Sequence, residues 1–371
     1  MSGPGEDDVW RLPSTVKTAD VRLSSGGSGK RRSPSLSSSA KARLTRIVNK
    51  TPEAMVKLTG RTRGRGHLKK HLDYITRHAK LTAIDQDGRL ISDKTKLRGL
   101  HDDWLLDNKA QGAQVRDDSK LAQSVSLVLS MPPGTPPDRV EQAAMTWAQQ
   151  TFKGTHDWIA VRHNDTAHPH VHVTVRAVGY DGKRLAPGPA DLQAWRDRFA
   201  RELRSLGVPA EATPRQARGV IPRSDRPAIH RMEKRGQTPH VRHYQQRDAT
   251  IASRKVRVEP KRDYAADIQA RQTNIQRAYL VRAEELASGD AADRQLAKDI
   301  VRFVQQMPVA KTRRDALADE LRAVTKQHPG RDAPPLDRIQ NRPPKAPQDG
   351  PQQTVKPVPE QTQSPTKGPR R

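Results

Sequence analysis

Residues 158–175, WIAVRHNDTAHPHVHVTV, decide the fold of this chain. From His170 onward, valines alternate with histidine or threonine, which is the period of a strand that buries one face. Residues 158–162 also have the composition of a strand and lead into His163, and the segment between the two strands contains Asn, Asp and Pro, which form turns. The stretch therefore predicts an antiparallel hairpin in which His163 lies opposite or diagonal to His170 and His172.

The histidines of this predicted hairpin have a spacing that suits metal ligands. Neighbours on one face of a strand are about 6.6 Å apart, so their ring nitrogens can share an ion at about 2.1 Å. We predict His163, His170 and His172 as ligands, with Asp165 as an orienting group or proton acceptor. His168 lies in the loop and is left unassigned. Three protein ligands leave coordination positions open, which favours catalysis, whereas structural zinc sites favour cysteine, and the chain has none.

Composition narrows the class of partner. The 371 residues include 68 Lys and Arg against 41 Asp and Glu, a net charge of +27, which indicates nucleic acid or an anionic membrane surface. No apolar run approaches the roughly 18 residues that span a bilayer, and the polar start MSGPGEDDVW is no secretory signal. We therefore expect no membrane insertion. The lack of cysteine excludes disulfides and thiol catalysis, and we expect a cytoplasmic protein.

The same composition suggests that only part of the chain folds, since 4% of its residues are aromatic. Ser, Gly and basic residues at one end, and Pro, Gln and basic residues at the other, are typical of disorder. We predict four parts, which are a disordered basic arm at 1–50, a folded domain at 51–245, a basic helical extension at 246–328 and a disordered Pro-rich tail at 329–371.

Within the folded domain, strand and helix patterns alternate around one sheet. Residues 101–120 are polar and give no clear pattern. The basic stretch 215–262 shows little periodicity apart from a short helix at 228–234. Besides the hairpin, we predict strands at 54–59 and 124–130, and helices at 67–80, at 190–206 and after Pro136, with Thr135 as the N-cap.

The predicted helix at 67–80 has two faces. One is an apolar core stripe of Leu68, Leu72, Ile75 and Ala79. The other surrounds one tyrosine with groups that can be cationic and consists of His67, Lys70, His71, Tyr74, Arg77 and His78. This second face suits an anion. The alternative is that Tyr74 packs at the edge of the stripe and the charges are only solvated.

Two further segments are candidates for binding phosphate. Residues 60–66, GRTRGRG, read as a loop with three glycines and with Arg61, Arg63 and Arg65. The helix start at Thr135 is the second candidate, although capping alone also explains this residue. Together with Lys70 and Arg77 of the helix at 67–80, these segments give the predicted phosphate contacts, which are DNA contacts if the partner is DNA: Arg61, Arg63, Arg65, Lys70, Arg77 and Thr135.

A divalent ion beside a tyrosine in a basic protein indicates phosphoryl transfer to that tyrosine. A metal can offset the charge that develops on a phosphodiester while the phenolic oxygen attacks in line. Because the pKa of tyrosine is near 10, the phenol needs the ion, neighbouring cations or a base such as Asp165 to lose its proton.

Two motifs then resemble a known family. HNDTAHPHVHV at 163–173 resembles the histidine signature of relaxases, which are DNA strand transferases of the HUH endonuclease superfamily. HLDYITRHAKL at 71–81, which contains Tyr74, resembles the tyrosine motif of the P-type mobilisation relaxases, the branch that includes the T-DNA border endonuclease. The resemblance covers roughly residues 54–219, and the tyrosine motif precedes the histidines as it does in that family.

The resemblance implies an α+β fold at 51–245, with a central antiparallel sheet flanked by helices and followed by the helical appendage. It implies that Tyr74 nicks one strand at an origin of transfer and stays joined to the 5′ phosphate. His163, His170 and His172 match the metal triad, and Asp165 matches an acidic position of the motif. The resemblance implies Mg or Mn as the ion, although ligation by three imidazoles also suits Zn.

The resemblance further implies partners. These are DNA that is single-stranded at the nick, an accessory mobilisation protein and a type IV coupling protein. Members of that family travel with the DNA through a type IV secretion channel, so the resemblance implies export into a recipient cell. The basic C-terminal tail resembles the charged tails that serve as export signals, and its composition equally suits a solubilising tail.

Two rival interpretations remain. One is a non-catalytic nucleic-acid-binding protein in which the histidines hold a structural ion. The other is a rolling-circle replication initiator of the same superfamily, although in those proteins the tyrosine usually follows the histidines.

Overall fold

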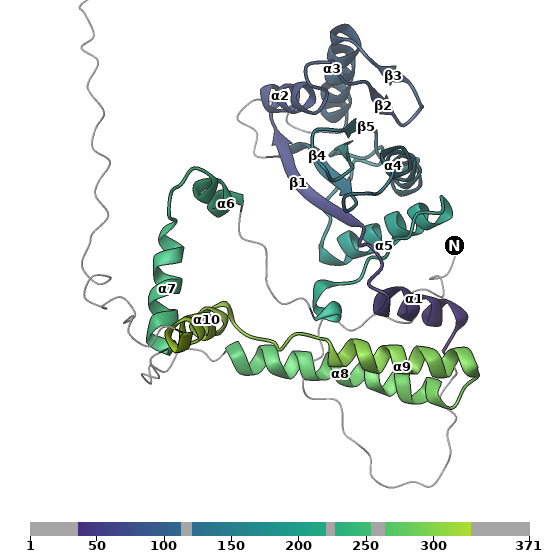
Figure 1. The fold of residues 1–371 in the computed structure, drawn as a ribbon. Helices are drawn as coiled ribbons and strands as arrows, with labels where there is room; N and C mark the ends of the chain where they lie inside the picture. Colours follow the sequence, from purple (N-terminus) through teal and green to yellow (C-terminus); the bar gives the residue numbers. More distant parts are fainter. Residues whose placement is uncertain (1–35, 113–120, 220–226, 254–263, 328–371) are drawn as a thin grey trace, which may run out of the picture. The chain divides into compact units, whose positions relative to one another are not determined.

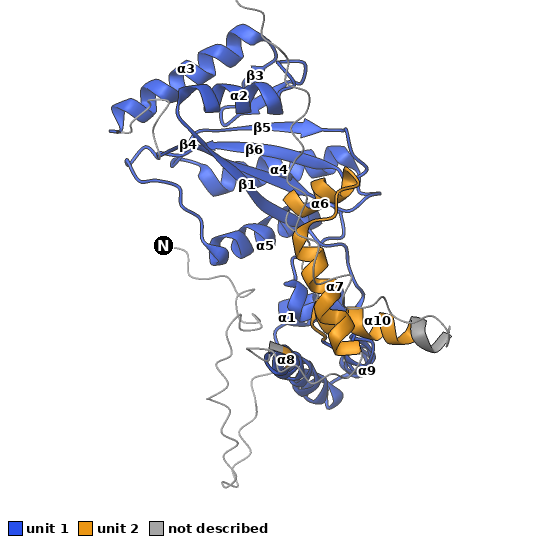
Figure 2. Ribbon diagram, turned by 90° about the vertical axis from the view of Figure 1, so that its left-hand side faces the viewer, with its two compact units in different colours: residues 1–221, 266–310 blue, residues 222–265, 311–371 orange. Residues whose placement is uncertain are grey.

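The structure is a computed structural model that describes residues 36–112, 121–219, 227–253 and 264–327 (Figure 1). The chain forms two compact units, one of residues 1–221 and 266–310 and the other of residues 222–265 and 311–371 (Figure 2). The tail predicted at 329–371 lies outside the described residues, and the division of the chain at 50, 245 and 328 stays a prediction.

The first unit is built on an antiparallel sheet of six strands in the order β1-β4-β6-β5-β2-β3. This confirms the α+β class and the central antiparallel sheet flanked by helices. The strands are β1 (Met55–Arg63), β2 (Ala83–Asp85), β3 (Leu90–Ile91), β4 (Ala122–Ser130), β5 (Trp158–His163) and β6 (His170–Arg176).

Helices cover both faces of this sheet (Figure 2). Helices α4 (Pro137–Phe152) and α5 (Pro189–Ser205) pack on the face that carries Val125, Val173 and most of the sheet's valines and leucines. Helices α2 (Arg65–Ile75) and α3 (Lys94–Ala110) pack on the other face, against Ile159 and Val161 of β5. The candidate site lies on this second face, because the predicted histidines share it.

The hairpin β5–β6 has the register that the alternating pattern predicts. His163 pairs with His170, and Val161 pairs with His172. The inward side chains Val171, Val173 and Val175 are at most 1% exposed and belong to the core under α4 and α5. Burial of the valines fixes the strand's orientation and forces both imidazoles of β6 to the α2 face.

Strand β1 and helix α2 differ from the prediction. The segment expected to be a phosphate-binding loop, residues 60–66, is the second half of β1 plus the start of α2. A bulge between Leu58 and Gly60 lets β1 continue its pairing with β4. Gly64 then makes the turn alone, with a φ of 72° that other residues rarely adopt. Helix α2 ends at Ile75 instead of Lys80 because the next residues adopt left-handed conformations.

The remaining helices and strands of the sheet domain agree in part with those predicted from the sequence. Helix α5 matches the helix predicted at 190–206, and β4 matches the strand predicted at 124–130. Helix α4 begins after Pro136, and the Thr135 hydroxyl donates to the carbonyl oxygen of Pro132 (2.9 Å), so Thr135 is not the N-cap. The polar segment after Lys94 forms α3, which the pattern did not reveal, and the short strands β2 and β3 were not predicted.

A second apolar cluster in the first unit joins helices from distant parts of the sequence. These are α1 (Ser38–Val48), α8 (Tyr264–Ala287) and α9 (Ala291–Gln305). We expected residues 38–48 inside a disordered arm, but Leu44 and Ile47 are buried beside Tyr279 and Phe303. Arg46 also donates to Glu211 across 2.7 Å. These contacts order α1 although its own composition is polar.

The second unit contains α6 (Pro227–Lys234), α7 (His240–Ser253) and α10 (Arg313–Gln327). Helix α6 agrees with the short helix predicted there, whereas α7 was hidden in a stretch without apolar periodicity. Arg322 of α10 donates to the carbonyl oxygen of Ala252 in α7 (2.8 Å). Across the part of the chain that the structure describes, no helix has the length and apolar character needed to cross a bilayer.

Candidate metal and tyrosine site

Three imidazoles meet where strands β5 and β6 join their connecting loop. Their potential ligand nitrogens all lie within 4.8 Å of one another. The ring centroid of His163 is 4.3 Å from that of His172, and His170 lies 5.4 Å from each of the other two. No other group of this kind occurs among the described residues. The structure thus brings together the three histidines that the sequence selected.

Backbone carbonyls orient two of the three rings. Nε2 of His163 lies 2.6 Å from the carbonyl oxygen of Ile75, and Nδ1 of His170 lies 2.9 Å from that of His168. A carbonyl oxygen only accepts hydrogen bonds, so each of these ring nitrogens carries the proton. The lone pairs are therefore on Nδ1 of His163 and Nε2 of His170, and such second contacts normally fix the ligating nitrogen of a metal-bound histidine.

The surroundings keep imidazoles of this group neutral. Burial, together with the nearby His163 and His170, lowers the pKa of His172 to about 3. Burial also lowers the pKa of His163, although its hydrogen bond to Ile75 opposes this shift. Neutral imidazole is the form that binds metal, so the chemistry of this group fits a divalent ion at about 2.1 Å after small ring rotations.

The loop residues flank this group without joining it. The side chain of His168 is exposed, and this residue contributes its carbonyl oxygen to His170. Asp165 is half exposed, and its Oδ1 lies 3.7 Å from Nε2 of His170. Its other carboxylate oxygen pairs with the Arg77 guanidinium. Asp165 therefore links the histidines to the segment that follows α2.

Tyr74 lies beside the triad although it is far away in the sequence. The edge of one ring faces the other in the pair Tyr74 and His172, with centroids 6.4 Å apart and an interplanar angle of 86°. The Arg77 guanidinium carbon lies 5.3 Å from the centre of the tyrosine ring. Because Tyr74 is 56% exposed, its phenol can be reached from solvent. The tyrosine ring is thus not buried among the residues of the apolar stripe.

An unusual turn after α2 produces this arrangement. Arg77, His78 and Ala79 all have positive φ, between 52° and 63°. The Thr76 hydroxyl holds the turn because it donates to the carbonyl oxygen of Leu72 (2.8 Å) and accepts from the Ala79 amide (3.1 Å). In a continuing helix the Ala79 amide would donate to Ile75. The turn frees the Ile75 carbonyl for His163 and places Arg77 between Tyr74 and Asp165.

His71 has a role that sequence reasoning missed, since we grouped it with an anion-binding face. Its Nε2 lies 2.9 Å from the hydroxyl of Thr174 on β6 and 2.8 Å from that of Ser126 on β4. Burial lowers its pKa to about 4, so this imidazole is neutral. His71 fixes α2 to the sheet one turn before Tyr74. The signal available in the sequence was the set of hydroxyl residues that alternate with valine and leucine in those two strands.

The predicted DNA contacts are spread over several surfaces. Arg61 and Arg63 are exposed on the edge strand β1, Arg65 is the first residue of α2, and Lys70 is exposed on α2. Of the predicted contacts, Arg77 is the one that touches Tyr74.

A cavity of about 530 Å³ lies where the histidine loop meets the start of α4. Thr135, Arg162, His163 and Asn164 are among its lining residues. The Thr135 amide and hydroxyl both donate to the Pro132 carbonyl oxygen, and Arg162 pairs with Asp138 and Glu141. Thr135, which we expected to bind phosphate here, and its neighbour Arg162 are thus already engaged within the chain.

Comparisons with known proteins point the same way. Residues 74–207 match the family described as "Relaxase: MobA/VirD2-like, nuclease domain", a range that begins at Tyr74 and includes the triad. A stretch of 184 residues is 24% identical to the T-DNA border endonuclease VirD2 of Rhizobium radiobacter. That match covers 46% of this chain and 43% of the relative's length. No solved structure matches the chain.

Proposed function

We propose that the chain is a relaxase, which nicks one DNA strand at an origin of transfer by transesterification onto Tyr74. The match of residues 74–207 to the MobA/VirD2-like relaxase nuclease domain supports this proposal. The observation that carries the proposal is an exposed phenol beside three clustered imidazoles and a guanidinium. The net charge of +27 supports a polyanionic substrate.

In the proposed reaction the phenolic oxygen of Tyr74 attacks the scissile phosphorus. The bond from phosphorus to the 3′ oxygen breaks, which leaves a 5′ phosphotyrosine and a free 3′ hydroxyl. The phenol gives up its proton and the departing 3′ oxygen gains one, so the step needs no external energy source. Rejoining is the same reaction in reverse, with the 3′ hydroxyl as nucleophile.

The residues around Tyr74 have separate roles in this proposal. His163, His170 and His172 hold a divalent ion, which would withdraw charge from the non-bridging phosphate oxygens when bound. Arg77, whose guanidinium lies over the tyrosine ring, pairs with an oxygen of the scissile phosphate. Asp165 holds Arg77 in place and accepts the proton of the phenol. His71 keeps α2, and with it Tyr74, at a fixed depth on the sheet.

The remaining expectations also belong to this proposal. Mg or Mn is the ion to test first and Zn is the alternative, because the ligands are all imidazoles. Arg61, Arg63, Arg65 and Lys70 contact phosphates outside the reacting position, whereas Thr135, whose hydroxyl is engaged with Pro132, meets DNA only as part of the wall of the cavity beside the histidine loop. We expect the chain to act in the cytoplasm with an accessory mobilisation protein and a type IV coupling protein, and to be exported with the DNA.

The decisive variant is Tyr74→Phe. Incubated with a supercoiled plasmid that carries a candidate origin and with Mn or Mg, the wild-type chain should yield a nicked strand linked to protein on a denaturing gel. Tyr74→Phe should yield no adduct and still bind origin DNA with an affinity within about twofold, because the oxygen that it lacks forms the covalent bond. Tyr244→Phe is the matched control, since Tyr244 is 60% exposed.

This experiment also separates the rival functions. An adduct formed by Tyr74→Phe would show that another residue is the nucleophile. A wild-type chain that binds origin DNA, with no adduct under any metal, would favour the non-catalytic protein with a structural ion. Cleavage at a replication origin in place of an origin of transfer would favour the rolling-circle initiator.

A further inference from the structure

One face of α7, in the second unit, carries rings and a cation where exposed helices usually carry flexible charged side chains. His240 is three and four residues before His243 and Tyr244, and Arg247 is four and three residues after them, so all four share one side of the helix. The rings of His240 and His243 are 6.5 Å apart, and the Arg247 guanidinium carbon lies 5.8 Å from the centre of the Tyr244 ring. His240, His243 and Tyr244 are exposed.

Packing of the second unit does not explain this ring face (His240, His243, Tyr244 and Arg247). The buried residues of α7 are Ala249 and Thr250, and α10 packs on the helix through Arg322 and the Ala252 carbonyl. Exposed rings contribute little to stability. Their presence on a surface therefore suggests a contact with a partner.

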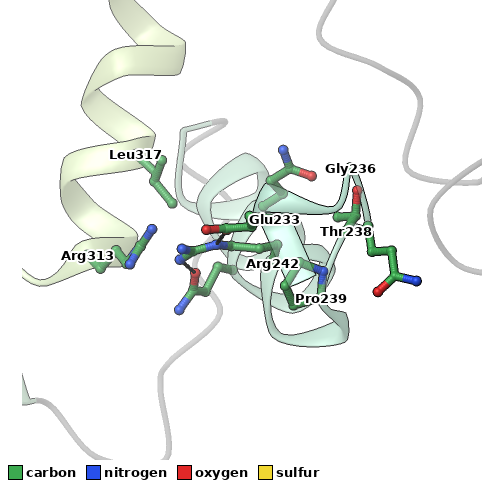
Figure 3. Close-up of a pocket in the computed structure, with 10 residues that line it drawn as sticks. Glu233, Gly236, Thr238, Pro239, Arg242, Arg313 and Leu317 are labelled. Carbon is green, nitrogen blue, oxygen red and sulfur yellow. Dashed lines mark hydrogen bonds and ion pairs between the residues drawn. The ribbon is translucent and has the colours of Figure 1, made fainter. Parts of the chain in front are cut away.

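A second arginine of α7, Arg242, has a structural role, and its contacts contrast with those of Arg247. A cavity of about 390 Å³ lies beside Arg242 and is lined in part by Glu233, Gln245 and Arg313 (Figure 3). Arg242 donates to Glu233 across 2.6 Å and to Gln245 across 3.0 Å. The bond to Glu233 offsets the charge of Arg242 and ties α6 to α7, so this cavity is a poor anion site. Arg247 differs, because the carboxylate of Asp248 is 3.9 Å away, beyond hydrogen-bonding distance.

The chemistry of the ring face fits unpaired nucleotides. Aromatic rings stack on the faces of bases, which are exposed in a single strand and covered in a duplex, while a nearby guanidinium binds the phosphates. Residues 227–253 and 311–327 also carry ten Lys and Arg against five Asp and Glu, so the described part of the unit attracts polyanions.

We propose that the ring face of α7 is a second DNA contact, which binds single-stranded DNA by stacking bases on Tyr244 and the two imidazoles and by pairing Arg247 with a phosphate. The inference rests on the proposed function in taking DNA as the partner, but it uses neither Tyr74 nor the triad. A chain that nicks one strand generates a single strand near itself, and this surface would hold part of it.

The test measures binding without cleavage. In full-length protein carrying Tyr74→Phe and without divalent ions, fluorescence anisotropy of an oligothymidine of about 30 nucleotides gives the affinity. Tyr244→Ala should weaken binding about tenfold, whereas Tyr244→Phe, which keeps the ring, should stay within about twofold. Leu106→Ala on α3 is the control for loss of an exposed apolar side chain, since Leu106 is 66% exposed, and it should change nothing.

Two further measurements locate the contact. Arg247→Gln should flatten the dependence of the affinity on salt by about one phosphate contact. Photocrosslinking of an oligonucleotide that contains 5-iodouracil should label the peptide 240–253. Because stacking needs unpaired bases, Tyr244→Ala should leave the affinity for a duplex of the same length unchanged.

The outcomes separate this inference from the proposed function. An affinity of Tyr244→Ala for oligothymidine within twofold of the parent, or an equal loss for the duplex, would overturn the ring face as a single-strand contact. If Tyr244→Ala weakens binding but wild-type protein forms no adduct at Tyr74, the ring face stands and the nicking proposal fails. An adduct at Tyr74 together with unchanged binding by Tyr244→Ala would support nicking and overturn the ring face.

Discussion

The two ends of the hairpin β5–β6 both carry polar side chains, but these side chains are used differently. At the end away from the loop, Arg176 donates to Asp157 across 2.6 Å, and the Tyr180 hydroxyl donates to the same carboxylate. At the loop end, hydrogen bonds to the described part of the chain involve one ring nitrogen of His163 and one of His170, and none of His172. We call the first end closed, because its charged side chains pair with each other even though Nη1 of Arg176 has no hydrogen-bond partner, and we call the loop end open.

This difference separates structural from functional polar groups. Arg176 is 1% exposed and Asp157 is 8% exposed, so their pairing offsets much of the cost of burying two charges and fixes the strands in register. The triad contains no buried ion pair of this kind, and burial lowers the pKa of His163 and of His172, which keeps lone pairs on these two rings. We therefore expect changes at one end to affect chemistry and changes at the other to affect stability.

The largest expected effect is at the open end. His170→Ala or His172→Ala should lower metal-dependent cleavage about a thousandfold or more, because each removes a ligand of the proposed ion. His168→Ala should change the rate by less than about threefold, since its carbonyl oxygen, which holds His170, remains. Single-turnover cleavage and calorimetric titration with Mn measure both effects. Equal losses in all three variants would contradict the choice of ligands.

The closed end should respond in stability. Asp157→Ala should lower the free energy of unfolding by about 3–5 kcal/mol, because it leaves the Arg176 guanidinium buried without its carboxylate. Urea denaturation measures the loss. The fraction that remains folded should cleave DNA at nearly the wild-type rate. The double variant Asp157→Leu with Arg176→Met, which removes both charges, should recover part of the stability, and a loss no smaller than that of Asp157→Ala would count against this account.

The smallest expected effect is a pH dependence that originates between the two ends, at His71. Burial lowers its pKa to about 4 in the folded chain, against about 6.5 when unfolded, so the unfolded state binds the extra proton. Its contribution to stability is therefore complete above pH 6.5 and declines by about 1.4 kcal/mol for each unit of pH down to about 4. Urea denaturation of metal-free protein at pH 5 and pH 7.5 should show the decline.

His71→Asn is the matched variant for this pH dependence. Asparagine does not titrate, so the difference in unfolding free energy between pH 5 and pH 7.5 should shrink by about 2 kcal/mol. An unchanged difference would show that His71 does not retain a low pKa in the folded chain.

The sequence predicted the parts of the site that depend on local periodicity. Alternation along one strand placed His170 and His172 on one face, and the parity of β5 added His163, because a strand's two faces follow directly from residue order. To predict the exposure and the position of Tyr74, one has to know at which residue α2 ends. The sequence could not predict where α2 ends. That end depends on the Thr76 hydroxyl, which accepts from the Ala79 amide, and on the Ile75 carbonyl oxygen, which accepts from His163 of β5.

Other departures have similar tertiary causes. The arginine-rich segment at 60–66 has the glycines of a loop, but pairing with β4 draws most of it into β1. Thr135 is of a residue type that often caps helices, but its hydroxyl donates to the carbonyl oxygen of Pro132 in the preceding turn. Helix α1 is polar by composition and is ordered by helices more than two hundred residues later in the sequence.

The left-handed turn after α2 also has a consequence for the chemistry of the ion. The Ile75 carbonyl is available to Nε2 of His163 because the helix stops there, so the length of α2 decides which nitrogen of that histidine faces the other two. A homologue in which the helix ran on by one turn would keep the same three histidines in its sequence and lose this tautomer. Residues 76–79 thus determine which nitrogen of His163 would face the proposed ion, although they lie almost ninety positions away from that ring.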